Sequence, residues 1–213
     1  ASFAVAACLE ALRQAGIENS PEELSETALI TASNFGDIDL GEAALIPPDH
    51  PEYQPEYAGD CTQRRPAAAV AAALRVGGPV IPLSLSCASG AAAVATAANL
   101  MCAGYFKRVV VVGYDAISRF SWSGLCSLRT MSKTAVRPFD VARDGTIFSE
   151  GAAALVLELR DTDTTPPLAW LRGWASGNNG HHITAPAVRG AGSRQVMAEA
   201  LACAGVSPTA VEH

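Results

Sequence analysis

The fold can be traced outward from one stretch, Pro82-Leu83-Ser84-Leu85-Ser86-Cys87-Ala88-Ser89-Gly90. Residues 80–85 alternate apolar residues with small or polar ones, which is typical of a short strand. From residue 88 to 102 the composition changes to alanine, glycine and serine, which favours a tightly packed helix. We therefore predict a strand that turns sharply into a helix, with Cys87 in the turn.

A cysteine at such a turn is a candidate nucleophile. The turn presents its side chain above the end of a sheet, and N–H groups at the helix start can hold developing negative charge. The positive end of the helix dipole also favours a thiolate over a thiol. The alternative is that Cys87 is one more buried small apolar residue, as free cysteines usually are.

Further motifs follow in the chain, and their order and spacing match one family. The motifs are Ser86-Cys87-Ala88-Ser89-Gly90, Gly113-Tyr114-Asp115-Ala116, Arg137-Pro138-Phe139-Asp140-Val141-Ala142-Arg143-Asp144-Gly145 and Glu150-Gly151-Ala152. The chain resembles the β-ketoacyl-acyl carrier protein synthases, which share the thiolase fold with polyketide ketosynthases. This resemblance implies an α/β fold, a layered α-β-α sandwich, with residues 1–213 forming the N-terminal half. Family members carry a first strand before this region and a C-terminal half after it.

The resemblance also implies a chemistry. Cys87 would be acylated by a thioester, and malonyl-acyl carrier protein would then lose carbon dioxide and attack the acyl group, in fatty-acid or polyketide biosynthesis. The acyl groups would travel on the phosphopantetheine of an acyl carrier protein, with no other cofactor. In the family, the histidines and lysine of the second stage lie in the C-terminal half. We therefore expect this chain alone to accept an acyl group without forming a carbon–carbon bond.

A second interpretation remains open, a non-catalytic ketosynthase-like partner of the chain-length-factor type. Such a subunit would shape a pocket or dimerise with an active synthase. The retained Cys87 favours the enzyme, because non-catalytic members characteristically replace the nucleophile. In the family, the strand before the nucleophile pairs with its twin across a two-fold axis. We therefore expect a homodimer, or a heterodimer with a ketosynthase-like subunit, through residues 80–85.

Several aromatic and histidine side chains match the family's acyl pocket. Phe120, Trp122 and Phe148 are candidate lining residues, although ordinary core packing explains the aromatic residues equally well. His182 falls on the histidine of the family's His-x-Thr-x-Pro loop, and Asn179 stands where many members have an aspartate.

Charged residues concentrate in residues 137–145. We predict that Arg137, Asp140, Arg143 and Asp144 form a salt-bridged turn with a structural role. Glu150, which opens the next expected strand, is predicted to support the active centre rather than to react.

Composition limits the other interpretations. The 213 residues are 49% hydrophobic, enough for a globular core, and the net charge of −6 argues against nucleic acid or an anionic membrane as a partner. Prolines and serines interrupt the uncharged stretch between Arg75 and Lys107, which favours a strand and a buried helix over a membrane span. The adjacent histidines 181 and 182 lack nearby acidic or cysteine ligands, so we predict no metal site.

The six cysteines show no CxxC pair and no regular framework. This pattern argues against disulfides and structural zinc, and it favours the reducing cytoplasm. The remaining patterns predict helices at 3–14, 66–76 and 190–204, and a short helical segment that starts at 20–23. They also predict strands at 28–33, 108–113, 152–159 and 168–175, an irregular loop at 47–66 and a short helix within 120–132. The continuous β-branched run 108–113 indicates a strand covered on both faces.

Overall fold

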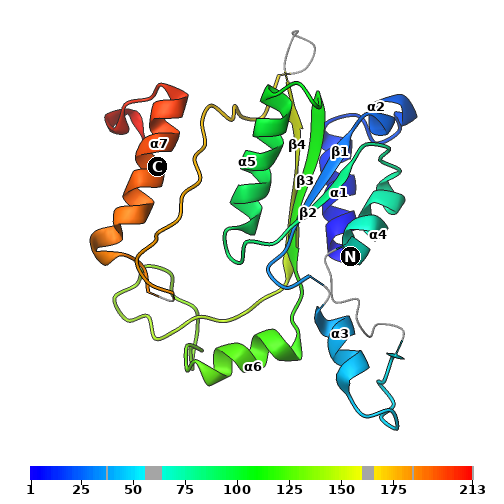
Figure 1. Ribbon diagram of the computed structural model, residues 1–213, viewed down its shortest axis with the longest axis vertical. Helices are drawn as coiled ribbons and strands as arrows, with labels where there is room; N and C mark the ends of the chain where they lie inside the picture. The colour runs from blue at the N-terminus through cyan, green and yellow to red at the C-terminus, as the bar shows by residue number, and fades with distance from the viewer. Residues whose placement is uncertain (37, 56–63, 160–165, 184, 213) are drawn as a thin grey trace. The chain divides into compact units, whose positions relative to one another are not determined.

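The computed structural model describes residues 1–36, 38–55, 64–159, 166–183 and 185–212. It divides into two compact units, Ala1–Leu159 and Arg160–His213. The first unit contains the sheet, and the second contains helix α7 (Figure 1).

The sheet of the first unit has the strand order β2-β1-β3-β4. Strand β1 (Ala28–Ala32) is parallel to β2 (Val80–Leu83) on one side and to β3 (Arg108–Asp115) on the other. Strand β4 (Gly151–Glu158) runs antiparallel to β3 and forms the far edge. Because parallel strands end at the same edge of a sheet, the segments that follow β1, β2 and β3 gather there.

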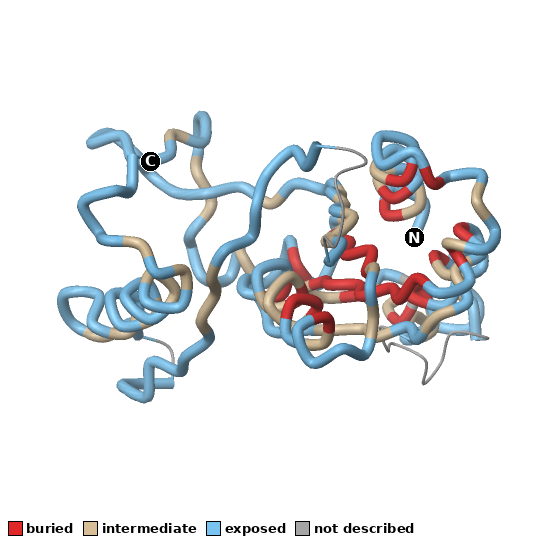
Figure 2. The backbone as a smooth tube through the Cα atoms, turned by 90° about the horizontal axis from the view of Figure 1, so that it is seen from above, coloured by how far each residue is buried: buried red, intermediate tan, exposed pale blue. Residues whose placement is uncertain are grey.

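Helices cover both faces of this sheet. Helices α1 (Ser2–Gln14) and α4 (Arg64–Leu74) lie on one face, and α5 (Ser89–Cys102) lies on the other (Figure 1). In β3, Val110 and Val112 pack in the core on the α1 side, whereas Val109 and Val111 pack on the α5 side. Buried residues concentrate in the sheet and on the helix sides that face it (Figure 2). The predicted α-β-α layering and the doubly covered strand are therefore confirmed.

The helices form where the sequence places small or apolar residues on one side. In α1, the buried residues Ala4, Cys8 and Leu12 repeat every four positions, and the helix is followed by Gly16 at a φ of +74°. In α5, Ala93 and Ala97 lie against the sheet, because alanine lets a helix approach closely. The side of α5 that carries Gly90 and Ala91 is exposed.

The structure differs from the sequence interpretation in the segments beside the sheet. Helices α2 (Pro21–Ser25) and α6 (Arg119–Ser127) fall in expected places, but α3 (Ile38–Leu45) was not predicted. Helix α4 begins at Arg64, inside the predicted loop 47–66, and residues 56–63 of that loop lie outside the described residues. The predicted core strand 152–159 is an edge strand, and it packs mainly against α1 on one face, so alternate residues on its other face, such as Leu155, are exposed.

In the second unit, the expected helix is confirmed and the expected strand is wrong. Helix α7 spans Ala191–Ala204, with Gly205 at a φ of +64° after it. Residues 168–175 form no strand, and the described part of this unit offers no other strand with which they could pair. A short 3₁₀ turn follows at Pro208–Ala210. None of the unit's described residues is buried.

Two buried threonines, one in β1 and one just before it, allow a prediction about stability. Thr31 in β1 is fully buried, and its hydroxyl has no hydrogen-bond partner among the described residues. The equally buried Thr27 donates its hydroxyl proton to the Glu23 carbonyl at 2.6 Å. Replacing Thr31 with valine should raise the free energy of unfolding by about 1 kcal/mol, because it removes an unpaired buried hydroxyl at constant shape.

The matched substitution Thr27→Val should lower the free energy of unfolding by a similar amount, about 1 kcal/mol, because it leaves the Glu23 carbonyl unpaired. Urea unfolding followed by circular dichroism measures both changes. Equal destabilisation by the two substitutions would show that the Thr31 hydroxyl has a stabilising partner.

Candidate active site

The turn between β2 and α5 has the geometry of a nucleophile elbow. Strand β2 ends at Leu83, α5 begins at Ser89, and the exposed Cys87 lies between them. Ser86 has a φ of +52°, a left-handed conformation that costs a non-glycine residue about 1–2 kcal/mol. Such strain persists only where the surrounding structure holds it, and it concentrates at functional sites. The predicted strand-to-helix turn is confirmed, and the nucleophile role of Cys87 stays a prediction.

The buried side chain of Ser89 holds this turn together. Its hydroxyl accepts a hydrogen bond from the Leu85 backbone N–H at 2.8 Å and lies 2.6 Å from the Ser86 carbonyl, to which it donates. The Ser89 backbone N–H also donates to the Ser86 carbonyl, at 3.0 Å. The backbone and the side chain of Ser89 therefore both bind the strained Ser86, and they fix the position of the next residue, Cys87.

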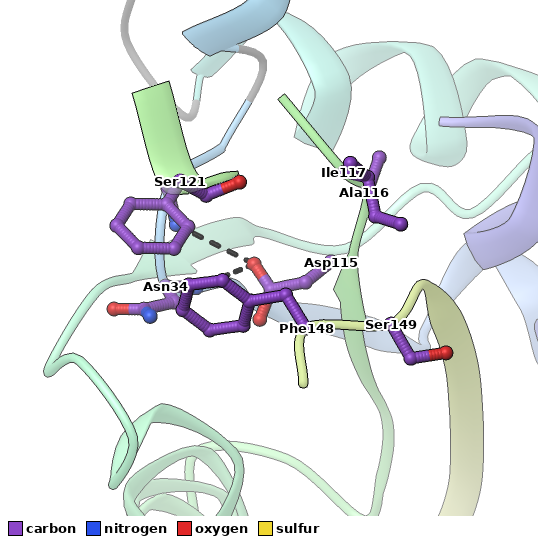
Figure 3. A pocket seen from close by; sticks show the side chains of 8 residues that line it. Asn34, Asp115, Ala116, Ile117, Ser121, Phe148 and Ser149 are labelled. Atoms are coloured by element: carbon purple, nitrogen blue, oxygen red, sulfur yellow. Dashed lines mark hydrogen bonds between the residues drawn. The ribbon is translucent and has the colours of Figure 1, made fainter. Parts of the chain in front are cut away.

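A loop that follows β1 lies beside this turn and depends on Asp115, the last residue of β3. One carboxylate oxygen of Asp115 accepts hydrogen bonds from the Ser33 hydroxyl at 2.8 Å, the Asn34 N–H at 2.9 Å and the Phe35 N–H at 3.4 Å. The two bonds from backbone N–H groups are drawn as dashed lines in Figure 3. The Ser33 hydroxyl oxygen in turn accepts the Gly36 N–H at 2.8 Å. We call residues 33–36 the β1 loop.

The β1 loop also contacts the Cys87 turn. The Ser33 N–H donates to the Leu83 carbonyl, and the Ser33 carbonyl lies 3.3 Å from the Ser89 hydroxyl. One residue further on, the Asn34 carbonyl accepts a hydrogen bond from the Ser84 hydroxyl at 3.2 Å. The turn that carries Cys87 is thus joined to β3 through the β1 loop.

The β1 loop also lines a small pocket, beside a group of aromatic rings. The Phe35 ring lies edge-on to Phe120, with centroids 5.7 Å apart, and to Phe148, with centroids 6.0 Å apart. Asn34, Phe35, Asp115, Ile117 and Phe148 are among the lining residues (Figure 3). The volume of about 70 Å³ is well below the several hundred Å³ typical of ligand sites.

The structure brings two of the three predicted aromatic residues together. Phe120 and Phe148 meet through Phe35, a residue that the sequence interpretation did not single out. Trp122 lies on α6 and is 42% exposed. The assignment of these rings to an acyl pocket stays a prediction.

Helix α6 is held at its start by a carboxylate from α3. Ser118 and Ser121 form a capping box at the helix N-terminus. The Glu42 carboxylate accepts the backbone N–H groups of Arg119, at 3.1 Å, and of Phe120. Because a negative charge stabilises a helix N-terminus, α3 fixes the start of α6, where the Phe120 ring contacts Phe35.

The prediction that salt bridges hold the turn at 137–145 is wrong. The four ion pairs found among the described residues involve Arg13, Arg108 and Arg119, not this turn. Instead, its charged side chains bind main-chain groups and hydroxyls. Arg137 donates to the Ala142 carbonyl and the Thr134 hydroxyl, Arg143 donates to the Asp140 carbonyl, and Asp140 accepts the Ala142 N–H.

Asp144 and Glu150 also accept hydrogen bonds from groups that lie close to them. The Ser132 hydroxyl donates to Asp144 at 2.7 Å, and this bond holds the pKa of the Asp144 carboxyl below its usual value. Gly145 next to it has a φ of +154°, and a β-carbon there would lie 2.6 Å from the Thr130 carbonyl oxygen. Glu150 accepts the Ile117 N–H at 3.5 Å, beside the pocket.

The second unit contains the loop with His182. The His182 Nδ1 accepts the Ala185 N–H at 3.2 Å, which closes a turn. The Asn179 side chain donates to the Ala185 carbonyl and accepts the Ala187 N–H. An aspartate could not make the first of these bonds, because a carboxylate has no donor. The pocket role of His182 stays a prediction.

Among the described residues, no group of three histidine, cysteine, aspartate or glutamate side chains is arranged to hold a metal ion. No described helix has the length and the apolar composition that crossing a membrane requires.

The residues that sequence reasoning missed are the anchors Ser33, Ser89, Asp115 and Glu42. Ser89 and Asp115 belong to the motifs that carry the family resemblance, but their roles depend on partners far away in sequence. The Asp115 to Ser33 bond spans 82 positions, and the Glu42 to Phe120 bond spans 78. Only the location of Asp115 at the end of a buried strand could have suggested its role.

Comparison with known proteins assigns the chain to a family. The geometry is that of a thiolase-like fold with a cysteine at the elbow before its central helix. Residues 1–162 match the model of the β-ketoacyl synthase N-terminal domain, and residues 168–213 match that of the C-terminal domain. The chain belongs to the β-ketoacyl synthase family. The boundary between the two matches lies a few residues after the boundary between the two compact units.

Individual relatives agree with this assignment. The 3-oxoacyl-[acyl-carrier-protein] synthase 2 of Vibrio harveyi is 25% identical over 99% of this chain and 54% of its own length. The Synechocystis enzyme of the same name is 33% identical over 60% of this chain and 33% of its own length. The chain therefore spans about half the length, or less, of the curated relatives that it matches.

Solved structures support the fold. A β-ketoacyl synthase from Burkholderia phymatum has a TM-score of 0.80 at 23% identity, covering 98% of this chain and 54% of that one. A type II polyketide ketosynthase in complex with its acyl-carrier protein has a TM-score of 0.81 at 22% identity, covering 99% of this chain and 56% of that one. The predicted thiolase-like fold is confirmed.

The different exposure of the cysteine thiols allows a prediction about chemical labelling. With limiting iodoacetamide, we expect Cys87 to be alkylated first among the described cysteines, because it is exposed at a helix start. Cys8 should stay unlabelled in the folded chain, because burial raises the pKa of its thiol to about 12. Peptide mass mapping measures the order of labelling.

Labelling in urea provides the control, since Cys8 should then react like the other thiols. Preferential labelling of Cys126 in the folded chain would contradict the nucleophile assignment. Cys61 lies outside the described residues, and its preferential labelling would contradict the assignment equally.

Proposed function

We propose that this chain is part of a β-ketoacyl-acyl carrier protein synthase in which Cys87 accepts the acyl group. The observation that supports this most directly is the exposed Cys87, placed on a strained and firmly anchored turn immediately before α5. A nucleophile needs access to substrate and a fixed position relative to the donors that stabilise the reacting oxygen. The turn supplies both.

Acylation would exchange one thioester for another. The Cys87 thiolate attacks the carbonyl carbon of an acyl thioester, and the carbonyl oxygen becomes negatively charged. In the first turn of α5 the Ser89 N–H already binds the Ser86 carbonyl, so the N–H groups of Gly90 and Ala91 would be the donors that suit this oxyanion. The tetrahedral intermediate then collapses, the carbon–sulfur bond to the carrier breaks, and the carrier leaves as a thiolate that takes up a proton.

In the second stage of the proposed reaction, malonyl thioester loses its carboxylate as carbon dioxide, and the resulting carbanion attacks the acyl carbon on Cys87. The bond between that carbon and the Cys87 sulfur breaks, which regenerates the thiolate. We assign no residue of this chain to the decarboxylation. The acyl and malonyl groups would arrive on the phosphopantetheine of an acyl carrier protein, with no other cofactor, in the cytoplasm.

The acylation step can be tested directly. After incubation with a hexanoyl thioester of N-acetylcysteamine, we expect the chain to gain one hexanoyl group, located on Cys87 by peptide mass mapping. The Cys87→Ala variant should gain none, because alanine has no nucleophile. Cys102→Ala is the matched control, because it removes another exposed thiol and should leave acylation unchanged.

Absence of acyl-Cys87 in a folded chain would favour the second candidate, a non-catalytic ketosynthase-like partner. One solved structure similar to this chain is a ketosynthase in complex with its chain length factor, from Xenorhabdus doucetiae, with a TM-score of 0.77 at 24% identity, covering 95% of this chain and 51% of that one. The retained Cys87 is the reason for preferring the enzyme.

We also propose that the chain dimerises through β2. Among the described residues this strand pairs only with β1, so its other edge is open there. Leu29 and Ser33 donate to the carbonyls of Pro79 and Leu83, so Val80 and Pro82 direct their backbone groups to the open edge. Pro82 therefore removes a donor from that edge and not from the sheet. A second β2 strand would pair the remaining groups.

Sedimentation velocity at increasing protein concentration tests this pairing. We expect a dimer for the parent chain and a monomer for Val80→Lys, because a charge on an edge strand blocks strand pairing. Val141→Lys is the control, since Val141 is exposed and far from β2 in sequence. A parent chain that stays monomeric at all concentrations would contradict pairing through this edge.

A further inference from the structure

We infer that Asp115 is a positioning residue for Cys87, acting through the β1 loop. This inference rests on the proposed function, because it concerns how the reactive thiol is held for acyl transfer. Asp115 is the last residue of β3, and its carboxylate binds the loop rather than the thiol itself. The chain of contacts runs from Asp115 to Ser33, from Ser33 to Ser89 and from Ser89 to the turn.

The first step is the dependence of the β1 loop on Asp115. A single carboxylate oxygen accepts three donors from consecutive residues of the loop. Ser33 is buried, and Asn34 and Phe35 are half-buried, so removing the acceptor leaves polar groups with poor access to water. An unpaired buried donor costs about 1–3 kcal/mol, so the loop must shift to find other partners.

The second step is the dependence of the turn on the β1 loop. The carbonyls of Ser33 and Asn34 lie within hydrogen-bond distance of the Ser89 and Ser84 hydroxyls. A loop that shifts carries these two carbonyls away from the turn. Ser89 then loses one of the contacts that orient its hydroxyl between Leu85 and Ser86.

The third step is the strain at Ser86. A left-handed non-glycine residue persists only while its neighbours hold it, so a loosened Ser89 lets Ser86 relax to an ordinary conformation. That rotation would move Cys87, the next residue. Because a displacement of about 1 Å at a reacting centre can cost as much as a hundredfold in rate, Asp115 affects acyl transfer without touching the substrate.

The test compares Asp115→Ala, Asp115→Asn and the parent chain, with Asp49→Ala as the matched control at an exposed aspartate. Each protein is treated separately with the hexanoyl thioester of N-acetylcysteamine and with iodoacetamide, and the modification rate of every cysteine is followed by peptide mass mapping. Cys102 and Cys203 are exposed and serve as reference thiols. Cys8 is buried in the core and reports unfolding.

We expect Asp115→Ala to slow modification of Cys87 by about tenfold with both reagents. The rates at Cys102 and Cys203 should not change, and Cys8 should stay unmodified. Asp115→Asn keeps an acceptor oxygen, so it should recover most of the rate at Cys87, and Asp49→Ala should match the parent. Recovery by asparagine would distinguish positioning by hydrogen bonds from a general effect on stability.

Two results would overturn the inference. One is an unchanged rate at Cys87 in folded Asp115→Ala. The other is a loss at Cys87 that is accompanied by modification of Cys8, which would show that Asp115 only stabilises the whole unit. Failure of the proposed function is a separate result, in which the parent chain takes no hexanoyl group on Cys87. The iodoacetamide rates test the role of Asp115 even then.

Discussion

The carboxylate of Asp115 and the backbone of the β1 loop face each other because β1 and β3 are adjacent parallel strands. The register pairs Ala32 with Gly113, so Asp115 lies two residues beyond the last pair, level with Asn34. At that height the ladder of backbone hydrogen bonds has ended, and the N–H groups of the loop need another acceptor. The carboxylate supplies it, and the arrangement of the site follows from this bond.

The strand order explains why this bond reaches Cys87. Strand β1 lies between β2 and β3, so the β1 loop lies between the segments that follow them. On one side it binds Asp115, and on the other it binds the turn through Ser84 and Ser89. A strained residue such as Ser86 needs support that is itself rigid. Here the support is β3, a long strand that is largely buried.

Features set by local patterns could be predicted from the sequence, and features set by distant partners could not. The alternation before Ser84 and the alanines after Cys87 specify the turn, and the run of valines in β3 specifies a doubly covered strand. Helix α3 was not predicted, because it is short and a proline-rich loop follows it. No local pattern could pair Ser33 with Asp115, which lie 82 positions apart.

The wrong predictions have physical causes of the same kind. Alternating charges at 137–145 suggested ion pairs, but exposed ion pairs contribute little, and main-chain groups in an irregular turn need partners. Arg137 and Asp140 satisfy those groups instead. Beside the pocket, the N–H groups of Phe35 and Phe120 donate to Asp115 and Glu42, and these are the two residues whose rings meet edge-on. The position of each ring is therefore set by a carboxylate from another element that binds its backbone.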